Sequence, residues 1–468
     1  MSRSILASAA AGLFCCLAVA GVNAAAVGDA PAIGVPTAVS ALPSNRLLTL
    51  ADLSDFALRN NPSTRAAWAG VLVDRAGLDA ALALTQPSVA LSLPLTLTHD
   101  ASAAPAVGRA LAPSLGLSWV LFDFGARAAG VDGARWQAAA SQLGYNRTLQ
   151  TVVVAVEQAY YGLLGARQLQ DVLQLGLEAA QASLDVARAY RLAGLATAGD
   201  TAQAEAAWAD ARLQFLRARA AARSAEGSLA YAVGLPANSV LALASDDSSD
   251  LGALPSLPGL AALAAQPIDD LLATARTSRA DLVALSALLQ QGEAQVIAAQ
   301  AQGRPSLGLS AQAVRRWSSD ASNAAGAGTQ GLALTLSIPL FDGGLVRAQV
   351  QAARARTQQL AAQRDQQRQT VELEVWQSFQ LADNAQAVIA AAQALLRSAS
   401  VADNAARERY SAGVGSLLEL LLAQSSAAQA RVSLVQARYD ARLAVAQLGF
   451  AVGYALQSAP PNLFQPMP

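Results

Sequence analysis

Few residues in this sequence have the types and spacing that catalysis or metal binding requires. The chain has one histidine, His99, and two cysteines, Cys15 and Cys16. A single histidine cannot form a histidine metal cluster, and a serine–histidine triad would have to use His99, which we expect in a hairpin loop. No glycine-rich phosphate loop follows a predicted strand. We therefore expect no enzyme activity, no cofactor and no metal.

The most informative charged side chains follow two glycine-containing turns. Asp200 ends the segment RLAGLATAGD, which contains Gly194, and Glu419 lies in SAGVGSLLEL, which contains Gly413. Each carboxylate lies at the start of a predicted helix, where it can compensate the helix dipole. Alternatively, symmetry-related copies of Glu419 that converge on one axis would repel one another and form a weakly cation-favouring constriction. Both roles stay open at this stage.

The composition is typical of long helices in close contact. The chain has 468 residues, of which 113 are alanine and only 2 are methionine, and all 32 basic residues are arginine. The missing lysine is consistent with a GC-rich genome. Because 33 acidic residues balance the basic ones, no excess positive charge is available for a phosphate backbone, and we expect no nucleic-acid partner.

The first 26 residues have the layout of a secretory signal peptide. Arg3 precedes an apolar stretch, and small residues follow around Ala24–Ala26, where cleavage would remove both cysteines. Lipid modification of Cys16 is an alternative, although the expected small residue does not stand just ahead of it. No later run of about 18 uninterrupted apolar residues occurs. We expect an exported protein that does not cross a membrane by helices.

The sequence repeats itself with an almost constant offset, which indicates a duplication. LFDFG at 121–125 is matched 219 residues later by LFDGG at 340–344. The same offset relates Gly194 to Gly413, and AVGLP to AVGY. Three landmarks that keep one register over more than a hundred residues exclude chance agreement.

Each half has the same order of predicted elements. Two strands, with apolar residues on one face and small or polar residues on the other, follow a shorter helix. The segment Leu345–Ala412 has no glycine or proline and could span roughly 100 Å as one helix; Ala126–Ala193 is interpreted in the same way. Strands are expected at about 87–98, 113–123, 305–314 and 331–341, short helices at about 59–85 and 270–302, returning helices at about 200–232 and 416–449, and turns at 191–200 and 410–419.

These elements predict the following division of the chain. It comprises a signal peptide at 1–26, an N-terminal segment at 27–58, a first repeat at 59–235, a connector at 236–268, a second repeat at 269–454 and a C-terminal tail at 455–468.

Strands of about ten residues with one apolar and one small polar face match the wall of an outer-membrane barrel. Aromatic residues near the strand ends fit interfacial positions: Trp119, Phe122, Phe124, Trp317 and Phe341. Four strands cannot close a barrel, and open edges are not tolerated in lipid, so the barrel must be shared between chains. Twelve strands would leave a water channel, which favours a trimer over a dimer. The alternatives are a small soluble sandwich for the strands and a two-stranded coiled coil for the helices.

The chain resembles the TolC-like family of outer membrane efflux and secretion ducts. The likeness covers nearly the whole mature chain and rests on the duplicated halves, LFDFG and LFDGG, the two turns and AVGLP. It implies a mainly helical homotrimer whose twelve-strand barrel, in outer-membrane lipid, continues into a long periplasmic helical barrel. Such ducts open passively when a periplasmic adaptor (membrane fusion) protein and an inner-membrane RND or ABC transporter recruit them for tripartite efflux or type I secretion.

In this family the two turns form the periplasmic tip that closes the duct. The acidic residue that ends the first turn matches Asp200, and the tyrosine that opens the second matches Tyr410. Of two aspartates at the narrowest point, the first aligns with Glu419 and the second with Leu422, which has no carboxylate. Gly415 stands where the best-known member has an arginine that latches the closed tip. The resemblance therefore implies a gate here, with a weaker latch.

Arg191 or Arg409 could partly substitute for the missing arginine. We expect the adaptor to contact exposed residues of the two turns: Arg191, Gly194, Leu195, Gly413 and Val414. The alternative is that the glycines serve backbone geometry alone.

The sequence is compatible with two functions from different classes. A passive transport duct explains both the helices and the strands. An exported periplasmic coiled-coil scaffold or adaptor protein explains the helices, but not four lipid-suited strands in two equivalent pairs. Drugs, metal ions and secreted proteins all fit the sequence as cargo.

Overall fold

The structure is a computed structural model that describes residues 47–99, 107–243, 266–318 and 327–453. The expected signal peptide with its two cysteines, most of the N-terminal segment, most of the connector and the C-terminal tail lie outside the described residues.

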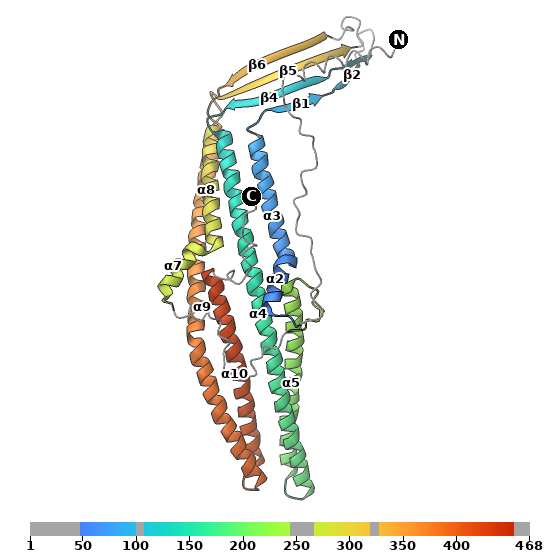
Figure 1. Ribbon diagram of the computed structural model, residues 1–468, viewed down its shortest axis with the longest axis vertical. Coiled ribbons are helices and arrows are strands. Elements are labelled where there is room, and N and C mark those ends of the chain that lie inside the picture. Colours follow the sequence, from blue (N-terminus) through green and yellow to red (C-terminus); the bar gives the residue numbers. More distant parts are fainter. Residues whose placement is uncertain (1–46, 100–106, 244–265, 319–326, 454–468) are drawn as a thin grey trace. The chain divides into compact units, whose positions relative to one another are not determined.

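Two helices of 67 residues each, α4 (Ala126–Leu192) and α9 (Leu345–Ser411), form the longest elements. At 1.5 Å per residue each spans roughly 100 Å, which confirms the expectation of long unbroken helices. Returning helices of 36 residues, α5 (Ala198–Val233) and α10 (Leu417–Val452), pack along them (Figure 1). The first hairpin of helices contacts the second mainly through α4 and α10.

Shorter helices pack on the other ends of α4 and α9. They are α2 (Leu50–Asn60), α3 (Pro62–Ala83), α7 (Ile268–Ser278) and α8 (Ala280–Ala301). The expected single helix at 270–302 is wrong, because the chain becomes extended at Arg279 (ψ 118°). The equivalent break lies at Asn61, where the following proline disfavours helical backbone. Both breaks let the chain change direction beside the returning helix.

The two breaks use different side chains for the same task. Asn61 donates from Nδ2 to the carbonyl of Ala232 at 2.9 Å, and Arg279 donates from Nη1 to the carbonyl of Ala451 at 3.2 Å. Both carbonyls lie in the last turn of a returning helix, where backbone acceptors lack helical partners. The duplication thus preserves the contact while the residue that makes it has changed.

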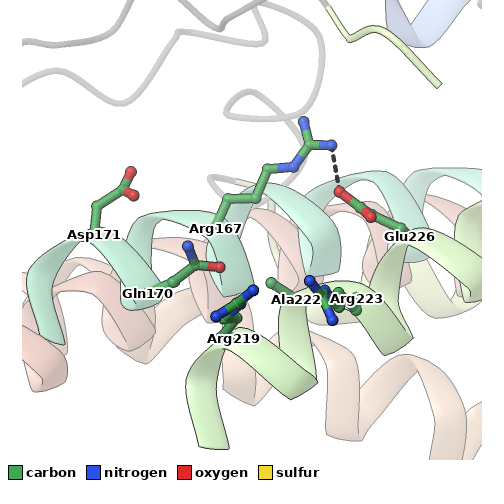
Figure 2. A pocket seen from close by; sticks show the side chains of 7 residues that line it. All are labelled: Arg167, Gln170, Asp171, Arg219, Ala222, Arg223 and Glu226. Atoms are coloured by element: carbon green, nitrogen blue, oxygen red, sulfur yellow. Dashed lines mark hydrogen bonds and ion pairs between the residues drawn. The ribbon is translucent and has the colours of Figure 1, made fainter. Parts of the chain in front are cut away.

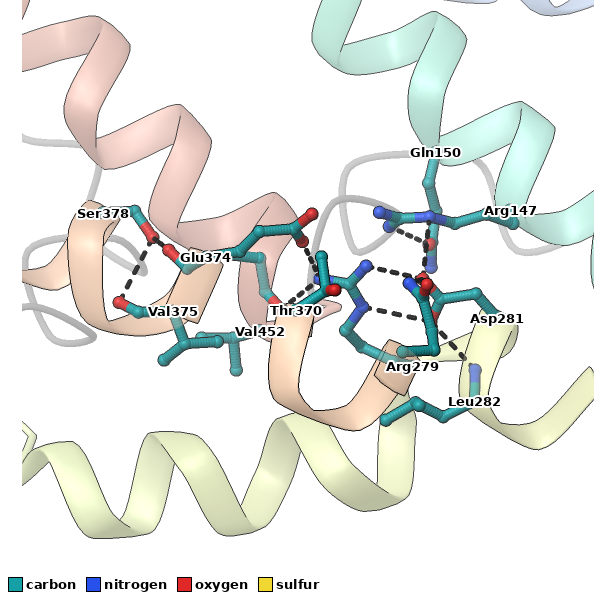
Figure 3. Close-up of polar contacts among 12 residues, drawn as sticks. Arg147, Gln150, Arg279, Asp281, Leu282, Thr370, Glu374, Val375, Ser378 and Val452 are labelled. Atoms are coloured by element: carbon teal, nitrogen blue, oxygen red, sulfur yellow. Dashed lines mark hydrogen bonds and ion pairs between the residues drawn. The ribbon is translucent and has the colours of Figure 1, made fainter. Parts of the chain in front are cut away.

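Arg279 is also the centre of a buried ionic cluster that joins the two repeats (Figure 3). Its guanidinium is fully buried and pairs with Asp281 on α8 and Glu374 on α9. Arg147 from α4 lies 3.7 Å from Asp281 and 3.8 Å from the centroid of the Phe450 ring. Burial, and then the nearby charge of Arg279, lower the pKa of Arg147 to about 10, so Arg147 stays charged at neutral pH. Burial alone would lower the pKa of Arg279, but hydrogen bonds to Asp281 and Glu374 outweigh it and raise the pKa, so Arg279 is charged as well. This buried ionic cluster therefore connects helices α4, α8, α9 and α10.

Apolar contacts between the helices are made largely by small residues. Ala187, Ala204, Ala427 and Ala430 are among the most completely buried side chains. A larger cluster around Tyr160 and its neighbours packs α2, α4 and α5 together. Alanine at such contacts lets helices approach closely, so the helical layer has no thick core.

In the described residues, all strand pairs are antiparallel, and the strands form four lines that lie side by side. These strands are β1 (Ser88–Ser92), β2 (Leu95–His99), β3 (Val107–Leu111), β4 (Ser114–Phe122), β5 (Ser306–Ser318) and β6 (Ala327–Ser337). Strand β1 pairs with β4, β4 with β5, and β5 with β6, while β2 and β3 extend the first two lines. Within the described residues, the outer edges of β1 and β6 have no partner strand.

Proline explains where the strands differ from expectation. The expected strands at 87–98 and 113–123 become four pieces, because Pro94 and Pro113 lie on the two lines one residue out of register with each other, and neither has an N–H to donate to the ladder. Strand β6 ends at Ser337, two residues before Pro339, instead of reaching 341. His99, expected in a loop, is the last residue of β2.

The repeated LFDFG and LFDGG segments prove to be helix starts. Asp342 accepts hydrogen bonds from the amides of Gly344 (2.9 Å) and Val346 (2.8 Å) at the start of α9. Asp123 accepts the corresponding bonds at the start of α4, together with one from Arg127 Nε at 2.7 Å. The glycine at each N-cap has φ 89°, a left-handed conformation that strains other residues. The motif therefore couples each strand to its long helix.

The charge of Asp123 is expected to hold the first turn of α4. Partial burial alone would raise the pKa of Asp123, but the hydrogen bonds and charge of Arg127 outweigh it and lower the pKa. The stabilisation is thus present above the unfolded-state pKa of about 4 and is lost as the pH falls through the lower folded-state pKa. Asp123→Ala should cost about 1–2 kcal/mol locally and speed hydrogen exchange at the start of α4 about tenfold. Unchanged exchange at neutral pH would contradict this role; Asp132→Ala, an exposed carboxylate in the next turns, is the control.

Two of the described helices, Ala280–Ala301 and Leu345–Ser411, are long and apolar enough to cross a membrane by length and composition alone. Alanine supplies much of this apolar character, and both helices pack lengthwise on other helices. The apolar stretches of these two helices include charged residues, so neither is an uninterrupted apolar run.

Candidate functional site

The two turns that join the long and returning helices share one backbone geometry. In the first, the amide of Leu195 donates to the carbonyl of Tyr190 at 2.8 Å, and Gly194 has φ 74°. In the second, Val414 donates to Arg409 at 3.0 Å, and Gly413 has φ 75°. This pattern is a Schellman cap, which satisfies the last helical carbonyls and needs a left-handed residue. The glycines thus have a backbone task, whatever else the turns bind.

The first turn holds Asp200 in a closed capping box. Thr197 donates its amide and hydroxyl to the Asp200 carboxylate at 2.7 and 2.8 Å, and Asp200 donates its amide back to the hydroxyl at 3.1 Å. These hydrogen bonds from Thr197 lower the pKa of Asp200, so the carboxylate is ionised at neutral pH. Helix capping is therefore the geometry observed for Asp200.

Glu419 occupies the same position in the second turn but has a different partner. Its amide donates to the Ser416 hydroxyl at 3.2 Å, and its carboxylate pairs with Arg409 across the turn at 2.5 Å. Both side chains are partly exposed, so the pair contributes little to stability. It does place a positive charge directly beside the only carboxylate of this turn. The sequence predicted that Arg191 or Arg409 could partly substitute for the missing arginine. In the structure Arg409 is the one that pairs with Glu419.

Gly415 is required by a close backbone approach. Its amide donates to the carbonyl of Arg409 at 3.0 Å, and a Cβ at this position would lie 3.0 Å from the amide nitrogen of Tyr410. Contacts this short force the backbone to shift. The turn therefore leaves little room for a Cβ atom at position 415.

Two tyrosines bring the turns together. The rings of Tyr190 and Tyr410 lie 5.7 Å apart, above a buried cluster that includes Leu184 and Leu417. Burial, followed by the proximity of Tyr190 and Asp200, raises the pKa of Tyr410, which stays neutral at physiological pH. The expected gate residues Asp200, Tyr410, Glu419 and Gly415 are thus neighbours within one chain.

The ends of the turns expose apolar side chains. Leu192 is 91% exposed, Leu195 76% and Val414 72%. Leu422, predicted at the constriction, is also exposed, one turn of α10 beyond Glu419. The sequence did not predict Leu192 as a residue of the tip, because it continues the apolar pattern of α4. Its side chain is exposed because α4 ends at this residue.

The aromatic residues expected near the strand ends fall into two groups. Phe122 and Phe124 pack edge to face at 4.7 Å where β4 leads into α4, and Phe341 lies at the equivalent place after β6. Trp119 is anchored there by a bond from Nε1 to the Thr85 carbonyl at 3.1 Å. Trp317 lies at the far end of β5. The sheet therefore has aromatic residues toward both ends.

Comparison with known proteins gives one consistent result. A family model described as outer membrane efflux protein matches residues 53–235 and 271–454, once in each repeat. Protein CyaE of Bordetella pertussis is 33% identical over 406 residues, which cover 86% of this chain and 83% of CyaE. Outer membrane protein OprJ of Pseudomonas aeruginosa is 28% identical over 415 residues, with coverage of 86% and 83%. The crystal structure of VceC from Vibrio cholerae has a TM-score of 0.72 at 22% identity and covers 86% of this chain and 96% of VceC.

These matches fit the geometry described above. They place the protein in the outer membrane with a large periplasmic part, and its relatives are channels and not enzymes. The chain belongs to the outer membrane efflux protein family, of the TolC-like type.

Proposed function

We propose that the protein is the passive, trimeric exit duct of a tripartite efflux or type I secretion system. The observation that carries the proposal is the sheet: four lines of strand per chain, with open outer edges at β1 and β6, connect directly to helices of 67 residues. Strand edges need partners in lipid, and three copies would close a twelve-strand barrel. The helices would continue this barrel as a periplasmic tube.

The side chains of the sheet support a membrane position. Leu332, Leu334 and Leu336 of β6 are all exposed on one face, while Ala333 and Thr335 lie on the other. Leucines on β1 and β2 are similarly uncovered. An apolar face that no other part of the described chain covers is suited to lipid, and the small polar face to a water-filled lumen. The aromatic residues Trp119, Phe122, Phe124, Trp317 and Phe341 would then lie at the interfaces.

The chain would be divided as its duplication suggests. The repeats 59–235 and 269–454 would each supply two strand lines and one helical hairpin, and 236–268 would connect them. The signal peptide 1–26 would be removed on export, leaving the segments 27–58 and 455–468 outside the repeats.

The tip turns would act as the gate and as the docking site. Asp200, Tyr410, Glu419, Gly415 and Leu422 would surround the constriction. A periplasmic adaptor protein, coupled to an inner-membrane RND or ABC transporter, would contact Arg191, Gly194, Leu195, Gly413 and Val414. Exposed leucine and valine at these turns support such a contact.

Arg409 is expected to set the ion preference of this gate. Arg409→Ala removes the partner of Glu419 and should raise the cation-over-anion permeability ratio of the duct severalfold in planar bilayers, because three unpaired carboxylates would then face the constriction. Glu419→Ala should shift the ratio toward anions. Arg407→Ala is the matched control, since Arg407 pairs with Asp403 within the same helix and not with Glu419.

The same recordings test the proposed function. Stable ion-conducting channels, with a basal conductance above that of the best-latched family members, are expected from the purified protein. Absence of conductance, together with recovery as a soluble periplasmic monomer, would favour the alternative of an exported coiled-coil scaffold or adaptor. Conductance that is low and unchanged in Glu419→Ala would contradict the placement of the gate.

A further inference from the structure

A groove between α4 and α5 gathers arginines in a way that the duct function does not use. It has a volume of about 420 Å³ and is lined by seven residues: Arg167, Gln170 and Asp171 from α4, and Arg219, Ala222, Arg223 and Glu226 from α5 (Figure 2). Buried Ala222 leaves room between the longer side chains. The groove lies far along both helices from the tip turns.

The charges in this groove are only partly compensated. Arg167 donates from Nη2 to Glu226 at 2.7 Å. Within the described ranges, neither Arg219 nor Arg223 forms an ion pair. Figure 2 shows Asp171 at the opposite end of the group from Glu226, apart from Arg223. Two guanidinium groups therefore face the groove without a carboxylate partner among the described residues.

The local sequence makes this charge unusual for the chain. Overall the protein is balanced, with a formal net charge of −1. Yet α5 carries four arginines, Arg212, Arg217, Arg219 and Arg223, and no acidic residue between Asp210 and Glu226. Like charges that share a groove repel one another and favour a bound counter-ion.

We propose that this groove binds a free multivalent oxyanion that carries at least two phosphate or carboxylate groups. Arg219 and Arg223 are one helical turn apart, about 6 Å along the axis, and Arg167 faces them from a helix packed at about 8–10 Å. A single compact anion can span three guanidinium groups at these separations, and each planar guanidinium can bind an oxyanion with two parallel hydrogen bonds. Gln170 supplies a further amide donor.

The dimensions favour a small anion over an acidic protein segment. The volume of the groove lies within the range of small-ligand sites. The cations that have no ion-pair partner in the described part of the chain are concentrated around Ala222. A bound helix or strand would need complementary charge along its length. Glu226 has a defined part in this site, because it competes with the ligand for Arg167.

Equilibrium dialysis of the full-length trimer in non-ionic detergent tests the proposal. Pyrophosphate and citrate are the probes, in buffer of about 10 mM ionic strength, where screening is weak. We expect saturable binding of one anion per chain. The double variant Arg219→Ala/Arg223→Ala should bind the anions at least tenfold more weakly than the wild type. The double variant Arg219→Lys/Arg223→Lys should bind them severalfold more weakly, because lysine keeps the charge but cannot form two parallel hydrogen bonds with one oxyanion. Glu226→Gln should bind about threefold more tightly, since it frees Arg167.

Arg217→Ala is the matched control, because this residue is on the same helix but does not line the groove. Its affinity should equal that of the wild type, and circular dichroism should show the same helix content in every variant. Equal affinity in Arg219→Ala/Arg223→Ala and wild type would overturn the proposal, as would the absence of saturable binding. Binding of tetraglutamate without binding of either small anion would also overturn it, and would identify the groove as a surface for an acidic protein segment.

Discussion

Leu332→Arg is expected to abolish assembly of the duct in the outer membrane. Leu332 is central in β6 and 74% exposed, and in the proposed trimer its side chain faces lipid. An arginine near the middle of the bilayer costs about 2–4 kcal/mol on the lipid face of a barrel, and the cost recurs in each of the three copies. We expect the heat-modifiable oligomer to disappear from outer-membrane fractions, with the variant degraded or left in the periplasm.

Ala333→Arg is the matched control, because successive residues of a strand face opposite sides of the sheet. Position 333 would face the lumen, so this variant should assemble and change conductance instead. Equal assembly of both variants would contradict the assignment of the apolar face to lipid. Loss of only the Ala333→Arg variant would indicate that the sheet is oriented the other way.

Arg279→Met should cause the largest loss of stability among the helical contacts. Arg279 is fully buried, pairs with Asp281 and Glu374, and donates to the Ala451 carbonyl (Figure 3). Methionine fills a similar volume but leaves these acceptors without their donor, which typically costs about 3–5 kcal/mol for a buried pair. Denaturant unfolding of the purified protein should therefore show a lower midpoint, and hydrogen exchange should increase first where α7, α8 and α10 meet.

The effect should depend on pH through Asp281. Burial alone would raise the pKa of Asp281, but Arg279 outweighs it through its hydrogen bonds and charge, with a contribution from Arg147, and the pKa is lowered. This stabilisation is present above the unfolded-state pKa of about 4 and is lost in more acidic solution, so wild type and Arg279→Met should converge there. Arg276→Met, which breaks an exposed pair with Glu372, should cost less than about 1 kcal/mol. Similar losses of stability in the two variants would contradict the role of the buried ionic cluster.

The long elements could be predicted from the sequence because each has a simple periodic signal. Leu345–Ala412 contains no helix breaker, and the observed helix ends one residue earlier. Alternation identified the strand lines, but not their interruptions at Pro94 and Pro113. The pairing register, which brings the two prolines to neighbouring positions, is not visible in either segment alone. The break at Arg279 had no local signal at all. Besides Asp281, the partners of Arg279 lie about 95 and 172 residues away in the sequence.

The sequence located the two turns, but it did not predict the contacts that their side chains make. Asp200 and Glu419 look equivalent in the sequence, since each lies three residues after a capping threonine or serine. Only the structure separates them: Asp200 returns to Thr197, whereas Glu419 reaches Arg409. The partner of the acidic side chain depends on which charged residue the preceding helix places near it. The spacing of residues in the sequence does not predict this partner.

Disulfide cross-linking between the two open edges of the sheet tests the account most directly. Both native cysteines lie in the expected signal peptide, so introduced cysteines should be the only thiols of the mature chain. One cysteine at Ala90 on β1 is combined in turn with one at Gly331, Ala333 or Thr335 on β6. On oxidation, at least one combination should give a covalent species of three times the monomer mass, with no larger product. Only monomer at every register, or an open ladder of higher oligomers, would contradict a closed trimeric barrel.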